Sequence, residues 1–150
     1  MNAPFVRDDS GAKPSLFGGR WELDNRRSSW SNGQFPTTGM KLEIELGFDG
    51  TTLTYRSVND TDPAAPKGLI FEAPMDGTPC ALTGSDRYDT VRVRLISTTE
   101  FEILHLKQDD VIVAAYWRVS ESGNALMRWG VGKSPAGLSK AYEEYFTRRP

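Results

Sequence analysis

Residues 17–24 read FGGRWELD and are the first part of the chain in which large apolar side chains alternate with polar ones. In an extended chain, Trp21 and Leu23 fall on one side, and Arg20 and Glu22 on the other. The two glycines that precede them permit backbone angles that other residues avoid, and leave room for a large ring against bare backbone. We therefore expect the first half-buried strand of a sheet here.

Length and composition are those of one ordinary globular domain. The chain has 150 residues, of which 38% are hydrophobic and 25% charged, and its formal net charge is −2. A chain of this length buries roughly two-thirds of its unfolded surface. Because no basic field is available to hold phosphates, nucleic acid is not expected as a partner.

No part of the sequence has the pattern of a membrane or targeting segment. No apolar run approaches the roughly 18 residues of a membrane span, and the first residues lack the apolar centre of a signal peptide. The single cysteine, Cys80, excludes an internal disulfide. These features predict a cytoplasmic protein without a membrane span.

The chain divides into a tail and a domain. Residues 1–16 contain prolines and scattered charge without periodicity, which predicts a flexible N-terminal tail, and 17–150 are expected to form the domain. The strands expected after the first are 42–46, 52–56, 69–72, 80–83, 91–95, 100–107, 111–120, 124–132 and 140–147. The last segment also contains helix formers, but its alternating aromatic residues favour a closing strand.

Nine or ten short strands joined by tight turns, with little helix, predict an all-β, antiparallel up-and-down sheet. A long sheet with alternating faces leaves the fewest exposed edges when it closes on itself. We therefore predict a single β-barrel of about 8–10 strands, which has room for its own side chains and at most one small ligand.

Residues 120–124, SESGN, fit a three-residue hairpin loop with its glycine in the left-handed conformation. This register places Trp117 opposite Met127, and Ala115 opposite Trp129. Because this face is apolar and contains two tryptophans, it is assigned to the barrel interior.

The opposite face of the same hairpin is expected to be exposed to solvent. The register pairs Tyr116 with Arg128 in a possible cation–π contact on the outside. Arg92 and Arg94 alternate with apolar neighbours in the same manner. All three arginines are therefore expected to face solvent.

The orientation of His105 depends on the turn that follows it. A two-residue turn at 109–110 directs His105 outward, whereas a three-residue loop directs it inward with Phe101 and Ile103. The second alternative is favoured because it keeps Glu102 out of the core, where an unpaired carboxylate is costly.

With its turns placed, the sequence resembles a widespread group of small bacterial lipocalin-like proteins of the calycin superfamily. The motifs that carry the resemblance are GRWELD at 19–24 with RS at 27–28, FDG at 48–50, DGTP at 76–79, TG at 83–84, TV at 90–91, VSESG at 119–123 and YFTRR at 145–149. These are turn and packing residues, so they imply a lipocalin-like barrel and say little about chemistry. The resemblance also implies that Arg148 or Arg149 stacks on Trp21 and fastens the two chain ends together.

The candidate ligand site combines aromatic and polar residues of several strands. Its members are Tyr55, Phe71, His105, Trp117, Met127 and Trp129. They could line a flat apolar cavity for a hydrophobic, ring-containing small molecule, which is the first functional hypothesis. The alternative that these side chains simply fill the barrel carries equal weight.

A second hypothesis is a cofactor-independent isomerase, cyclase or lyase, in which His105 or Tyr55 moves a proton. His105 as an ordinary wall or surface residue is the simpler alternative. With one histidine and one cysteine, no metal or other cofactor is expected. A third hypothesis is a filled barrel that acts through its surface, as a monomer or a homodimer.

Overall fold

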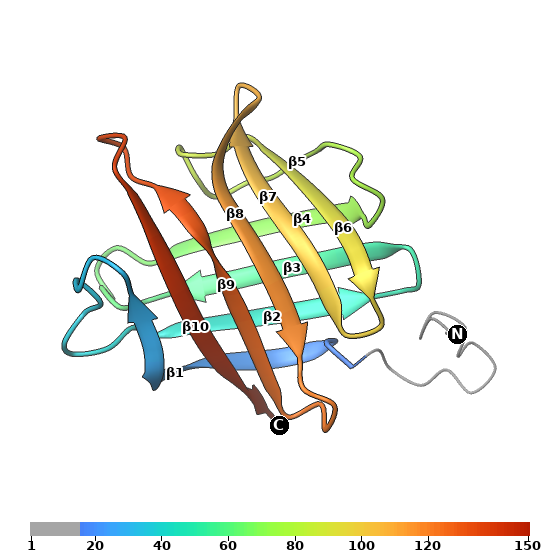
Figure 1. Cartoon of the computed structure of the whole chain (residues 1–150), viewed down its shortest axis with the longest axis horizontal. Coiled ribbons are helices and arrows are strands. Elements are labelled where there is room, and N and C mark those ends of the chain that lie inside the picture. The colour runs from blue at the N-terminus through green and yellow to red at the C-terminus, as the bar shows by residue number, and fades with distance from the viewer. Residues whose placement is uncertain (1–15) are drawn as a thin grey trace.

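The structure is a computed structural model that describes residues 16–150, and it consists of ten antiparallel strands (Figure 1). The strands are β1 (Gly19–Trp30), β2 (Leu42–Phe48), β3 (Thr52–Asn59), β4 (Lys67–Pro74), β5 (Cys80–Ala81), β6 (Thr90–Ser97), β7 (Glu100–Lys107), β8 (Asp110–Val119), β9 (Ala125–Lys133) and β10 (Ser139–Arg149). Their order in the sheet is β4-β3-β2-β1-β10-β9-β8-β7-β6-β5. The predicted all-β, up-and-down architecture is confirmed, and the C-terminal segment is a strand.

No helix occurs within residues 16–150, so this part of the chain has none long and apolar enough to cross a membrane. The flexible tail predicted over 1–16 lies outside the described residues except for its last member. Leu16 packs against the core, and the next residue, Phe17, is fully buried.

The sheet closes nearly completely because its two edges meet. Ile70 of β4 and Thr83, just after β5, exchange two backbone hydrogen bonds of 3.0 and 3.1 Å. Further along the seam, the amide of Gly77 donates to the carbonyl of Val93 at 2.8 Å. In Figure 1, β6 to β10 pass across β1 to β4, as in a flattened barrel. The shared interior between these two groups of strands contains the core.

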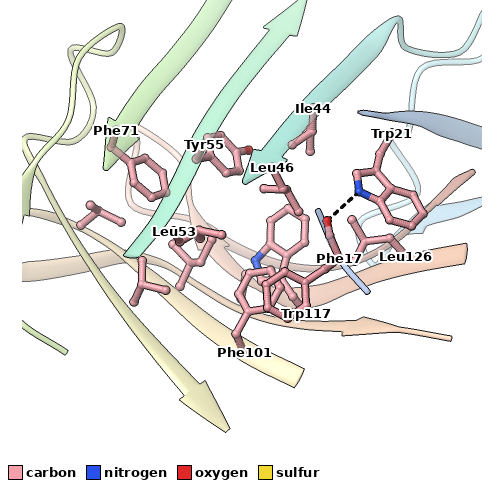
Figure 2. Packing of buried hydrophobic residues seen from close by; sticks show 14 of the residues in the cluster. Phe17, Trp21, Ile44, Leu46, Leu53, Tyr55, Phe71, Phe101, Trp117 and Leu126 are labelled. Atoms are coloured by element: carbon pink, nitrogen blue, oxygen red, sulfur yellow. Dashed lines mark hydrogen bonds between the residues drawn. The ribbon is translucent and has the colours of Figure 1, made fainter. Parts of the chain in front are cut away.

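One end of the barrel is filled by aromatic side chains. The indole nitrogen of Trp21 donates to the carbonyl of Phe17 at 3.0 Å (Figure 2). The ring of Phe17 lies 4.8 Å from that of Phe101, which stacks on Trp117 at 5.5 Å. All four side chains are buried, and we call this region the plugged end of the barrel.

Arg148 joins the two ends of the chain at the plugged end. Its guanidinium lies 4.3 Å above the Trp21 ring, and donates to the carbonyls of Gly18 at 2.6 Å and Gly123 at 2.7 Å. It also donates to the carbonyl of Leu16. Of the two arginines expected here, Arg148 therefore makes the contact.

The predicted register of the β8–β9 hairpin is wrong by one residue. Ser120 and Ala125 pair through a backbone hydrogen bond of 2.9 Å, which leaves four residues in the loop instead of three. Trp117 consequently lies opposite Arg128, not Met127. A one-residue slip exchanges the two faces of a strand.

This slip reverses three expected orientations. Arg128 faces the interior, where 17% of its side chain is accessible, instead of the solvent. Trp129 faces outward and is 54% exposed, and Met127 lies on that outer face as well. Arg92 and Arg94 are exposed as expected.

The turn between β7 and β8 follows neither predicted alternative. Gln108 and Asp109, with φ of 49° and 67°, form the two-residue turn between Lys107 and Asp110. A register shift of one residue between His105 and Leu106 accompanies this turn. His105 does face inward with Phe101 and Ile103, as favoured, since both of its ring nitrogens are buried, but a bulge rather than a longer loop places it there.

Candidate ligand site in the barrel interior

A charge pair lies at the centre of the barrel. Arg128 of β9 and Glu144 of β10 are directly opposite each other in the sheet. Nε and Nη2 of Arg128 lie 2.6 and 2.5 Å from Oε1 of Glu144, and only 4% of the Glu144 side chain is accessible. Since Trp30 Nε1 donates to Oε2 at 2.9 Å, both carboxylate oxygens are occupied.

The guanidinium stays charged in this environment. Burial lowers the pKa of Arg128, but Glu144 and the nearby Tyr55 and Tyr142 more than offset this effect, so that the pKa lies above its ordinary value. The cation and the carboxylate balance each other. The centre of the barrel is therefore strongly polar but carries no net charge from this pair.

Aromatic rings surround the guanidinium on several sides. It lies 5.4 Å from the rings of Trp117 and Phe146, and 5.7 Å from that of Tyr142. Tyr55 approaches Trp117 edge-on at 6.2 Å and stacks on Phe71 at 4.7 Å, with 8° between the planes. Figure 2 shows Tyr55, Phe71 and Trp117 from three different strands directed into the same interior.

His105 lies further along the interior, away from the plugged end. Its ring is 4.8 Å from that of Tyr88 and 6.5 Å from that of Phe71. Burial, reinforced by the positive charges of Arg128 and Arg87, lowers the pKa of His105 to about 4. The imidazole is therefore neutral at pH 7.

Three buried nitrogen atoms have no hydrogen-bond partner among the described residues. They are Nδ1 and Nε2 of His105 and Nε1 of Trp117. Buried polar groups are paired in the great majority of cases, and an unpaired one costs about 1–3 kcal/mol.

The structure brings together four of the six residues expected at the site. Tyr55, Phe71 and Trp117 are buried and share contacts, and His105 contacts Phe71. The slipped register separates Met127 and Trp129 from them. Trp129 instead borders an outer hollow of about 190 Å³ beside Ser29–Ser31 and residues 141–143.

A second hollow, of about 330 Å³, lies outside the barrel beside the β1–β2 loop. Asn25, Met40 and Thr61 contribute to its wall. Asn25 shapes this region by accepting from the Met40 amide at 2.6 Å and donating to the Met40 carbonyl at 3.0 Å. Its side chains are those of a surface loop and are separate from the interior pair.

Sequence reasoning missed both members of the charge pair. One signal for Glu144 was available, because it alternates with Tyr142 and Phe146 and must share their face. Trp30, whose indole N–H donates to the second carboxylate oxygen, was not among the residues expected at the site. Within residues 16–150, no group of three or more histidine, cysteine, aspartate or glutamate side chains could hold a metal ion.

The fold and this interior define a nearly closed, antiparallel barrel of ten strands, with an oppositely charged pair of side chains inside it. No protein-family model matches the sequence, and no curated protein matches it. Among solved structures, the chain is similar to zebrafish ileal bile acid-binding protein complexed with cholic acid, with 13% identity and a TM-score of 0.61 over 90% of this chain and 100% of that one. It is also similar to apo Caenorhabditis elegans lipid binding protein 8, with 14% identity and a TM-score of 0.56 over 89% and 96% of the two chains. At such identities the likeness shows the fold alone.

Proposed function

We propose that this protein binds a hydrophobic, ring-containing small molecule inside its barrel. The observation that carries the proposal is the position of Arg128, whose side chain points inward among aromatic rings yet keeps 17% of its surface accessible. We infer that this accessible surface borders space inside the barrel that a ligand can occupy. Such space, walled by flat rings and a few polar groups, is typical of a small-molecule site.

The nature of the two structural neighbours supports this proposal. One is a bile acid-binding protein that holds cholic acid, and the other is a lipid-binding protein. Both ligand classes are largely apolar. The stacked rings of Tyr55 and Phe71 and the indole of Trp117 offer a comparable ligand the apolar contact area from which affinity is gained.

The same residues favour binding over proton transfer. A general base needs a pKa near the working pH and a partner that orients it. The pKa of His105 is about 4, and neither of its nitrogens has a partner among the described residues. Burial raises the pKa of Tyr55, which keeps its phenol protonated. The isomerase, cyclase or lyase hypothesis therefore has less support than a binding role.

The test is native mass spectrometry followed by tryptophan quenching with a panel of aromatic and terpenoid compounds. We expect one ligand per chain and saturable quenching. Replacing the interior Trp117 by Phe should remove most of the quenching, whereas the matched outer variant Trp129→Phe should keep it. Failure of every compound to bind, or quenching that depends on Trp129 alone, would contradict interior binding.

A further inference from the structure

We propose that the interior selects uncharged ligands with a carbonyl or hydroxyl oxygen over ligands that carry a carboxylate. This inference rests on the proposed function and names the ligand class of the same site. It is carried by the charge pair of Arg128 and Glu144, by the remaining N–H groups of Arg128, and by the buried Trp117 indole N–H, which has no partner among the described residues.

The charge balance is the first step. Glu144 occupies the guanidinium through contacts of 2.5 and 2.6 Å, and is itself the only charged side chain among the buried residues of the described chain. A second carboxylate at Arg128 would lie within a few ångströms of Glu144, away from water. Two like charges in such a site cannot both remain ionised without a large cost.

The available donors are the second step. A guanidinium has five N–H groups, of which Glu144 and the nearby Tyr55 engage some. Because the contacts with Glu144 involve Nε and Nη2 of Arg128, the second terminal nitrogen, Nη1, could donate to a further acceptor oxygen. Trp117, whose ring lies 5.4 Å from the guanidinium, adds a buried indole N–H without a partner among the described residues.

These donors suit a neutral oxygen better than an anion. A carbonyl or hydroxyl group accepts from them without adding charge, whereas a carboxylate would have to displace Glu144. Displacement would also remove the acceptor of the Trp30 indole, which bonds to Glu144 at 2.9 Å.

Two further positive side chains, Arg87 and Lys140, lie close enough to the interior to act on its charged groups. Arg87 is exposed, and Lys140 is partly exposed with its ammonium over the Trp30 ring. Solvent screens the charge of Arg87, and the Lys140 ammonium is already in contact with the Trp30 ring, so we expect neither to attract a carboxylate into the interior strongly. The interior pair therefore determines the selectivity.

The experiment compares ligands that share a ring system and differ in charge. Cholic acid is paired with methyl cholate, and naphthaleneacetic acid with naphthaleneacetamide, and each is titrated at pH 7.4 by calorimetry. We expect the uncharged member of each pair to bind about tenfold more tightly to the wild-type protein. In Glu144→Gln, the guanidinium loses its counter-charge, so the preference should vanish or reverse in favour of the acid.

The control is Glu143→Gln, which removes a neighbouring carboxylate from the outer face and should leave the preference unchanged. Equal or tighter binding of the acids by the wild-type protein would overturn the inference while leaving the proposed function intact. An undiminished preference in Glu144→Gln would also overturn it. Binding of no member of either pair by any of the three proteins would overturn the selectivity and count against the proposed function itself.

Discussion

The environment of His105 makes the stability of the barrel depend on pH. Its pKa falls from 6.5 in an unfolded chain to about 4 in the folded one, chiefly because the ring is buried. Between these values the unfolded chain takes up a proton and the folded chain does not. This contribution to stability is therefore fully present above pH 6.5, and is lost as the pH falls toward 4.

The difference between the pKa values of His105 in the unfolded and the folded chain corresponds to about 3 kcal/mol of unfolding free energy. In His105→Phe, which keeps a ring between Tyr88 and Phe71, we expect this part of the pH dependence to disappear. Urea unfolding at several pH values between 7 and 4 measures it. The carboxylates titrate in both proteins and cancel in the comparison, so parallel stability curves would show that His105 is not the group responsible.

The second prediction at this scale concerns the Arg128–Glu144 pair. Removing one partner leaves the other as an uncompensated buried charge, so Arg128→Met and Glu144→Leu should each lose about 3–5 kcal/mol of unfolding free energy. The double variant replaces both charges by apolar groups and should lose less than either single variant. Urea unfolding of the four proteins gives the coupling energy directly, and strictly additive losses would refute a buried, mutually compensated pair.

At the scale of elements, Arg148 holds β1 and β10 together at the plugged end. Arg148→Lys removes the stacking on Trp21 and the hydrogen bonds to Gly18 and Gly123, because an ammonium cannot reproduce the planar fork. We expect a loss of about 2–4 kcal/mol in unfolding free energy. We also expect faster hydrogen exchange of the β1 amides.

The adjacent Arg149 provides the control for this variant. It pairs with the exposed Glu22 at 3.0 Å, and such surface pairs contribute about 0–1 kcal/mol. Arg149→Lys should therefore change stability and β1 exchange little. Equal losses in the two variants would mean that Arg148 has no special role in joining the chain ends.

The strands could be predicted from the sequence because one face of each is buried and the other is wet. The contact of Arg148 with Trp21 could also be predicted, since the resemblance to lipocalin-like proteins implied that Arg148 or Arg149 stacks on Trp21. The register of β8 and β9 could not be obtained from hairpin rules alone. The four-residue loop depends on the pairing of Ser120 with Ala125, and shifting it by one residue reverses every side chain that follows.

The interior charge pair escaped prediction for a related reason. When only the sequence of β9 is considered, the charged Arg128 is expected to face solvent and its apolar neighbour Trp129 to face the interior. The residue that makes Arg128 acceptable in the interior, Glu144, lies on the next strand, and the pairing becomes evident only when the register is known. Whether a polar side chain can lie in the interior depends on its partner, which is often on another strand. The burial of an apolar side chain can instead be predicted from the alternation along its own strand.

At the scale of the whole molecule, the barrel has one end filled by aromatic side chains and an interior with polar atoms that have no partner among residues 16–150. An interior ligand would stabilise the folded state in proportion to the logarithm of its concentration. The four tryptophans report on where such a ligand lies. Trp21 and Trp30 already donate to the chain, Trp117 has no partner among the described residues, and Trp129 is outside.

The most direct measurement follows the four indole N–H signals in a ¹H–¹⁵N spectrum during titration with methyl cholate. Each signal is assigned beforehand with a Trp→Phe variant. We predict that the Trp117 signal shifts saturably, because its N–H gains an acceptor or a new ring neighbour, while the Trp129 signal stays in place. A shift confined to Trp129, or no shift of Trp117 at a concentration where binding is saturated, would contradict a ligand site in the barrel interior.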